Sequence, residues 1–96
     1  MKLLTIIYDS SIDASMAELL EGLGIPGYTR FEHVFGDGGR GPRLNTPVFP
    51  GTNHVALVAL PDEEVGRVQR AIRRLQGSFR LKPGVTILCQ EVEVLP

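Results

Sequence analysis

The alternation of hydrophobic positions predicts a β-strand at the start of the chain, over residues 2–8. Leu4 and Ile6 lie on one face of this strand, and Leu3 and Ile7 lie on the other. A strand that is apolar on both faces is typical of a sheet that is covered on both sides. We therefore expect this strand to need two layers of packing.

Two segments have the apolar spacing of three and four residues that predicts an amphipathic helix. The first begins at a polar cap within residues 9–11 and ends at Gly24, which suits a left-handed C-terminal position. The second begins at Pro61 with Asp62 as its cap, and it ends at Gly77. The residues expected to be buried are Ile12, Met16, Leu19, Leu20 and Leu23 in the first helix, and Val65, Val68, Ile72 and Leu75 in the second.

Three further strands are expected, at residues 28–35, 54–60 and 84–95. In the first of them, strict alternation places His33 on the same face as Phe31 and Phe35. In the last, the alternation shifts phase, which indicates a β-bulge near Gln90 and Glu91. The order of the elements is therefore β-α-β-β-α-β, which is the ferredoxin-like arrangement.

We expect a single domain over residues 1–96, an α+β ferredoxin-like sandwich with two helices on one face of a four-stranded antiparallel sheet. The other face of the sheet is also apolar in the first and third strands, so something must cover it. For so short a chain the simplest cover is another copy of itself. The sequence therefore predicts a homo-oligomer with closed cyclic symmetry.

Residues 36–53 are the one long segment that matches neither periodicity, and they contain five of the eleven glycines and three of the seven prolines. Long loops without secondary structure are uncommon in compact domains and often carry function. Glycines from Gly36 to Gly41 allow successive backbone N–H groups to converge on an anion. Arg40 and Arg43 are then placed to clamp a phosphate or carboxylate. The competing interpretation is a plain hairpin connection.

Composition narrows the function classes. The formal net charge of −1 argues against a protein that binds nucleic acid through its overall field. Cys89 is the single cysteine, so an intrachain disulfide is impossible, and its apolar surroundings predict a buried thiol. No apolar run approaches the ~20 residues that a membrane span needs. We expect a cytoplasmic protein that does not insert into membranes.

The sequence contains no residue pattern typical of a catalytic site. His33 and His54 lie on strands expected to pair, so they are candidates for a metal site with Asp37 or Glu32, but no metal-binding spacing motif accompanies them. No serine follows the pattern of a nucleophile elbow, and Cys89 is far in sequence from either histidine. We therefore expect a protein that is not an enzyme and holds no resident metal.

The segments 21–29, 31–39 and 46–53 together resemble the P-II family of trimeric signalling proteins. In that family a glycine precedes the second strand, and the strand ends in a Gly-x-Gly that opens a long loop called the T-loop. The resemblance implies a trimer with its sheets facing inward. It also implies that ATP, ADP, AMP or another small anion binds between subunits, and that the loop 36–53 docks on a target transporter or enzyme.

Carried over by position, the resemblance implies that Gly27, Gly36, Gly38 and Arg40 line the cleft at the base of the loop. In classical members a phosphate-binding lysine follows a glycine-rich stretch after the second helix, and here that place is taken by Val85. The basic residues available instead are Arg80 and Lys82. With Arg43 of the loop, these residues make up the candidate ligand-binding set.

Two alternatives remain open from the sequence. One is a metal-responsive trimer of similar fold, like the CutA type, that uses His33 and His54. The other is an interaction module whose loop docks on a partner without any ligand.

Overall fold

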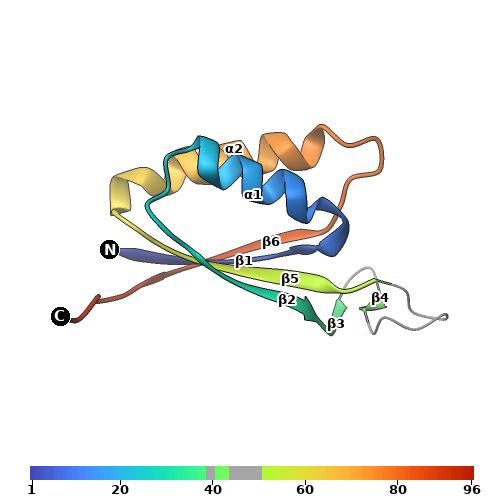
Figure 1. The fold of residues 1–96 in the computed structure, drawn as a ribbon, viewed down its shortest axis with the longest axis horizontal. Helices are drawn as coiled ribbons and strands as arrows, with labels where there is room; N and C mark the ends of the chain where they lie inside the picture. The colour runs from blue at the N-terminus through green and yellow to red at the C-terminus, as the bar shows by residue number, and fades with distance from the viewer. Residues whose placement is uncertain (39–40, 44–50) are drawn as a thin grey trace.

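The computed structural model describes residues 1–38, 41–43 and 51–96 of the chain, and Figure 1 shows their arrangement. Residues 39–40 and 44–50, in the middle of the expected loop, lie outside this description. The strands are β1 (Lys2–Asp9), β2 (Thr29–Val34), β3 (Gly36–Gly38), β4 (Gly41–Arg43), β5 (Asn53–Leu60) and β6 (Val85–Glu91). The helices are α1 (Asp13–Gly22) and α2 (Val65–Gly77), each preceded by a short 3₁₀ turn, at Ser10–Ile12 and Asp62–Glu64.

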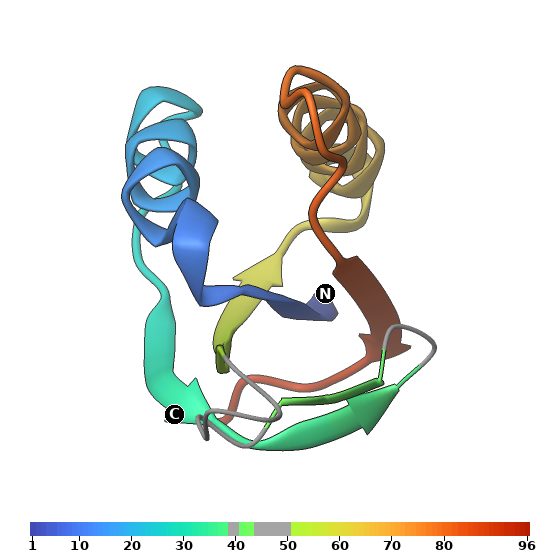
Figure 2. The same cartoon turned by 90° about the vertical axis from the view of Figure 1, so that its right-hand side faces the viewer.

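Four of the strands form an antiparallel sheet in the order β2-β5-β1-β6, as the ferredoxin-like arrangement requires. Both helices cover the same face of this sheet (Figure 1 and Figure 2). The predicted fold class is therefore confirmed. The segment 36–53 was expected to lack secondary structure, and this was wrong in part, because β3 and β4 pair with each other as a short hairpin.

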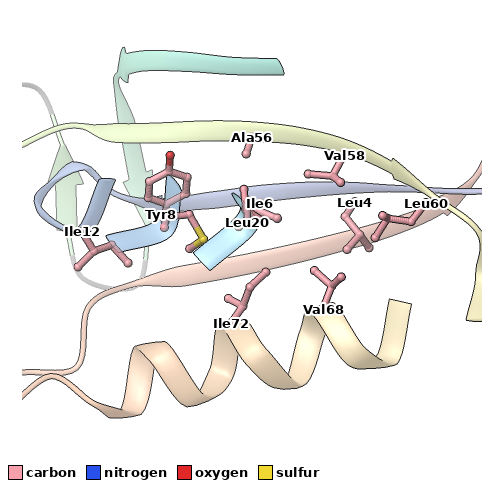
Figure 3. Packing of buried hydrophobic residues seen from close by; sticks show 11 residues of the cluster. Leu4, Ile6, Tyr8, Ile12, Leu20, Ala56, Val58, Leu60, Val68 and Ile72 are labelled. Carbon is pink, nitrogen blue, oxygen red and sulfur yellow. The ribbon is translucent and has the colours of Figure 1, made fainter. Parts of the chain in front are cut away.

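The hydrophobic core lies between the sheet and the helices. Leu4, Ile6 and Tyr8 of β1 are all buried in this core, and Figure 3 shows Val68 and Ile72 of α2 pointing toward Leu4 and Ile6. Residues directly opposite in an antiparallel pair share a face, so β5 contributes its own alternate residues to the same core. The other members of this core are Ile12, Met16, Leu20, Ala56, Val58 and Leu60.

The face of the sheet that carries no helix is also apolar. Leu3 and Ile7 of β1 and Leu57 of β5 lie on it half-buried. Phe31 of β2 and Leu88 of β6 lie on the same face at 50% and 52% exposure. This distribution agrees with the expectation that a strand apolar on both sides needs a second covering layer.

The ends of the helices agree with the sequence at one point and correct it at another. Gly24 has φ +73°, the left-handed conformation expected for it after α1. The prediction that Asp62 caps α2 was wrong, because Pro61 precedes the 3₁₀ turn and no side chain caps it. The Asp62 carboxylate instead lies 3.0 Å from the amino group of Met1. Asp62 therefore forms an ion pair with the amino group of Met1 and does not cap the helix.

The β-bulge lies in β2 rather than in β6. The register of β2 on β5 shifts between Phe31 and Val34, and His33 there has φ 53°. β6 keeps an unbroken register on β1 up to Glu91, where it ends, so the strand predicted to run to residue 95 is shorter than expected. The prediction of a bulge near residues 90 and 91 was wrong, because the phase shift in the hydrophobic alternation marks the end of the strand.

Cys89 was expected to be buried and is exposed. It lies opposite Leu4 in register, on the helix side of the sheet, but β6 is an edge strand and the end of it that carries Cys89 stays accessible. Among the described residues, no helix is long and apolar enough to cross a membrane.

Candidate functional site

The segment 36–53 begins and ends at one end of the sheet. Val34, the last residue of β2, pairs with Asn53, the first residue of β5. A Cβ atom added to Gly36 would lie 3.2 Å from the Asn53 side-chain nitrogen. The backbone at the start of β3 therefore lies close to the first residue of β5. Gly36 thus suits a backbone position with little free space beside it.

A second loop reaches the same end of the sheet. The Ser10 N–H donates to the Thr52 carbonyl at 3.0 Å, and the Asp9 N–H donates to the Gly84 carbonyl at 3.1 Å. Two consecutive residues at the end of β1 therefore hold the return of the segment 36–53 on one side and the end of the 78–84 loop on the other.

The 78–84 loop is anchored from α2. The buried Gln76 side chain donates from Nε2 to the Pro83 carbonyl at 2.7 Å. Arg73 donates from one guanidinium nitrogen to Gln76 Oε1 and to the Val85 carbonyl, both at 2.9 Å. These contacts fix the backbone on either side of Gly84, while Arg80 and Lys82 stay exposed.

The residues proposed from the sequence fall into three places. Gly36 and Gly38 bound β3, and Arg43 ends β4, at the same end of the sheet as the 78–84 loop (Figure 1). Arg80 and Lys82 belong to that loop, whereas Arg40 lies outside the described residues. Gly27 precedes β2, so the six residues of that strand separate it from the start of the segment 36–53.

A cluster of polar side chains fills the helix side of the sheet near this end. The Tyr8 hydroxyl donates to Asp13 Oδ1 at 2.7 Å, and the Arg30 guanidinium donates to Asp13 Oδ2 at 2.8 Å and to Glu32 at 2.5 Å. His54 Nδ1 lies 2.8 Å from the same Asp13 Oδ1, but not in line for a hydrogen bond. Asp13 thus joins α1 to β1, β2 and β5.

Burial and the neighbouring polar groups shift the pKa values of Asp13 and Tyr8. Burial acts to raise the pKa of Asp13, but the Tyr8 hydroxyl, His54 and Arg30 outweigh it and hold that pKa below its usual value. Burial, together with the hydrogen bond to Asp13, raises the pKa of Tyr8. Tyr8 therefore stays a neutral donor and Asp13 an ionised acceptor at neutral pH.

The two histidines meet, as the pairing of their strands predicted. Their ring centroids are 4.7 Å apart with the planes at 89°, and His33 Nδ1 lies 2.9 Å from Thr52 Oγ1. The prediction that His33 shares a face with Phe31 was wrong, because the bulge turns its ring to the side where His54 lies. Within residues 1–38 and 51–96, no three His, Cys, Asp or Glu side chains gather to hold a metal ion.

Sequence reasoning missed Asp13, Arg30 and Gln76. The signal for Gln76 was a polar residue within an apolar helical stripe, one position after Leu75. Asp13 and Arg30 are 17 positions apart and gave no signal, since nothing local indicates that they face each other.

Comparison with known families gives one match. The family described as nitrogen regulatory protein P-II matches residues 1–94. No curated protein matches the chain.

Solved structures share the fold. CPII from Thiomonas intermedia K12, bound to ADP and bicarbonate, has a TM-score of 0.70 at 22% identity, over 95% of this chain and 86% of that one. The same protein bound to ADP, AMP and bicarbonate has a TM-score of 0.69 at 21% identity, over 99% and 94%. A putative PII-like signalling protein from Thermus thermophilus has a TM-score of 0.66 at 26% identity, over 98% and 88%.

Proposed function

Because the chain belongs to the nitrogen regulatory protein P-II family, we propose that it is a P-II-like regulatory protein and not an enzyme. In this proposal residues 1–96 form one domain that assembles as a cytoplasmic trimer. A small anionic effector binds in the clefts between subunits, and the segment 36–53 contacts a target protein.

The observation that carries the proposal is that two loops reach the same end of the sheet and are both hydrogen-bonded to the end of β1. The Ser10 N–H binds the Thr52 carbonyl on one side of β1, and the Asp9 N–H binds the Gly84 carbonyl on the other, so the return of the segment 36–53 and the 78–84 loop flank the end of β1. In this proposal the effector bridges the segment that would dock on a target and the loop anchored by Gln76. The segment 36–53 would then contact both the effector and the target protein.

The charge of the site favours an anion. Arg80 is exposed and makes no hydrogen bond or ion pair with the other described residues. Together with Lys82, Arg40 and Arg43, it would supply cations for a phosphate or carboxylate, while the backbone at Gly36 and Gly38 allows close approach. Gly27, at the far end of β2, would then contact the part of an extended ligand that lies away from the charge.

Adenine nucleotides are the effector class to test first, with bicarbonate as a second anion, because the Thiomonas relatives were solved with ADP, AMP and bicarbonate. The metal-responsive alternative rests on the two histidines alone and is not part of the proposal. A protein that docks on its target without any ligand is the outcome if no effector binds.

The test is calorimetric titration of the purified oligomer with ATP, ADP and AMP, each with and without bicarbonate. The Arg80→Gln variant should bind at least about tenfold more weakly, since a charge-assisted hydrogen bond contributes about 1.5–3 kcal/mol. The matched control is Arg70→Gln, which removes an exposed arginine from α2 and should bind like the wild type. Absence of binding by every nucleotide, or equal loss in both variants, would refute the proposed site.

A further inference from the structure

His33 occupies an unusual backbone position at the end of β2. Its φ of 53° lies in the left-handed region, which residues other than glycine rarely adopt, and it coincides with the register shift between Phe31 and Val34. Such strained residues tend to cluster at functional sites, where the surrounding contacts hold them.

Two contacts hold His33 in this conformation. Its ring packs edge to face against that of His54, at 4.7 Å between centroids, and its Nδ1 lies 2.9 Å from the Thr52 hydroxyl. Thr52 is 2% exposed, and its carbonyl accepts from the Ser10 N–H. His33 at the end of β2 therefore contacts Thr52, the residue that precedes β5. Thr52 in turn accepts a hydrogen bond from Ser10, the residue that follows β1.

The partner ring is buried and neither of its nitrogens is hydrogen-bonded to a described residue. His54 is 4% exposed, and both Nδ1 and Nε2 lack a hydrogen-bond partner among the described residues. From β1 it faces Tyr8, at 5.8 Å between centroids, and from α1 it faces the Asp13 carboxylate at 2.8 Å. From β2 it faces His33, which is exposed to solvent.

The charged groups beside the two rings balance the charge of one imidazolium but not of two. Asp13 is negative, and its second oxygen is paired with Arg30, which is also paired with Glu32. With both imidazoles neutral, these three groups sum to one negative charge, so a single imidazolium is balanced. A second imidazolium places two like charges in adjacent rings, one of which is buried.

We propose that the His33–His54 pair is a proton-operated latch at the base of the segment 36–53. With at most one proton on the pair, His33 stays in its bulge and holds Thr52. When both imidazoles are charged, His33 leaves for solvent and releases the contact between the end of β2 and the start of β5. Since this contact borders the proposed effector site, the regulatory part of the inference rests on the proposed function.

The Ser10 amide reports directly on the latch, because its N–H donates to the Thr52 carbonyl. We would measure its hydrogen exchange by NMR at pH 7.5 and pH 5.5, corrected for the intrinsic pH dependence of exchange. The internal reference is the Val92 amide, which donates to the Met1 carbonyl at the other end of β1. Between the two pH values, protection of Ser10 should fall at least about tenfold relative to Val92, because release of Thr52 exposes the acceptor of the Ser10 N–H.

Two variants isolate the pair. His33→Asn keeps a residue that tolerates the left-handed region and retains a side chain within reach of Thr52, but cannot take up a proton. His54→Phe keeps a buried ring and removes the other imidazole. In both, the protection ratio should change by no more than about twofold between pH 7.5 and pH 5.5. An equal response in wild type and variants, or no response in wild type, would overturn the latch.

A second arm separates the latch from the proposed function. ADP affinity is measured at both pH values, and its ratio should differ at least about threefold between wild type and His33→Asn. If the Ser10 response is present but the affinity ratios are equal, the regulatory link is wrong. If ADP binds at neither pH while Ser10 responds, the proposed function fails and the latch stands.

Discussion

At the scale of single residues, backbone conformation and buried charge account for most of the local structure. Gly24 is the clearest case, because it ends α1 in a conformation that only glycine adopts readily. The sequence identified this residue from its place after the apolar stripe. It did not identify His33 as left-handed, because nothing in a histidine within an alternating strand indicates a bulge.

Gly24→Ala should lower the free energy of unfolding by about 1 kcal/mol, because the φ of +73° strains any L side chain even though the space is open. Gly77→Ala is the matched control. It lies at the end of α2, also with open space around its Cβ but without a positive φ, and should be neutral or stabilise by about 0.5 kcal/mol. Urea denaturation of both variants measures the difference, and equal effects would contradict the assignment.

Asp13 sets the acid side of the stability profile. Its pKa is lowered in the folded protein, so its contribution is present above the ordinary value of 3.8 and is lost as the pH falls through the lowered folded value. Asp13→Asn should lose about 1–2 kcal/mol at pH 7, because it weakens the contacts to Arg30 and His54. Its stability should also fall less steeply than that of the wild type as the pH is lowered in steps from 7 to below the ordinary value of 3.8.

Urea denaturation across that pH series measures the effect. Glu63→Gln, which removes an exposed carboxylate from the turn before α2, is the control and should follow the wild-type profile. A wild-type profile parallel to that of Asp13→Asn would mean that Asp13 does not carry the acid dependence.

At the scale of elements, the order and type of every strand of the main sheet and of both helices could be predicted, because each has a strong period. Boundaries were predicted less well where tertiary contacts decide them. The last strand ends at Glu91 and not at residue 95, because Glu91 pairs with Lys2, the first residue of β1. The β3–β4 hairpin was missed, since glycine and proline dominate its sequence.

The 78–84 loop depends on one buried amide. Gln76→Ala would leave the Pro83 carbonyl without its donor and should cost about 1–3 kcal/mol in the free energy of unfolding. Effector affinity should also fall, since Arg80 and Lys82 lose their rigid support. Gln69→Ala, at an exposed position of the same helix, should change neither stability nor affinity. Thermal unfolding and calorimetric binding on the pair of variants test this, and intact binding by Gln76→Ala would contradict the role of the loop.

At the scale of the whole molecule, the uncovered apolar face of the sheet predicts assembly. Leu57→Glu places a charge in the middle of that face, on a central strand, and should prevent the trimer from forming. Arg70→Glu on α2 is the control. Light scattering after size exclusion should give three times the chain mass of 10.5 kDa for wild type and control, and a smaller species for Leu57→Glu. A wild-type mass equal to one chain would refute the assembly.

The candidate site could be predicted only in outline. Glycines and arginines marked the segment 36–53. The placement of that segment and of the 78–84 loop on either side of the end of β1 depends on hydrogen bonds from Asp9 and Ser10, which no local pattern indicates. The family resemblance located the loop base, and the structure added the anchoring by Gln76.

We propose that an anionic effector binds at the end of the sheet where the segment 36–53 and the 78–84 loop flank β1. An NMR titration of the wild-type oligomer with ADP, followed through the backbone amides, locates the bound effector. The amides of Gly36, Asn53 and Gly84 should shift progressively and to saturation, while the amides of exposed α2 residues such as Arg70 should not. Shifts confined to the helix layer, or no shifts at millimolar ADP, would rule out this site.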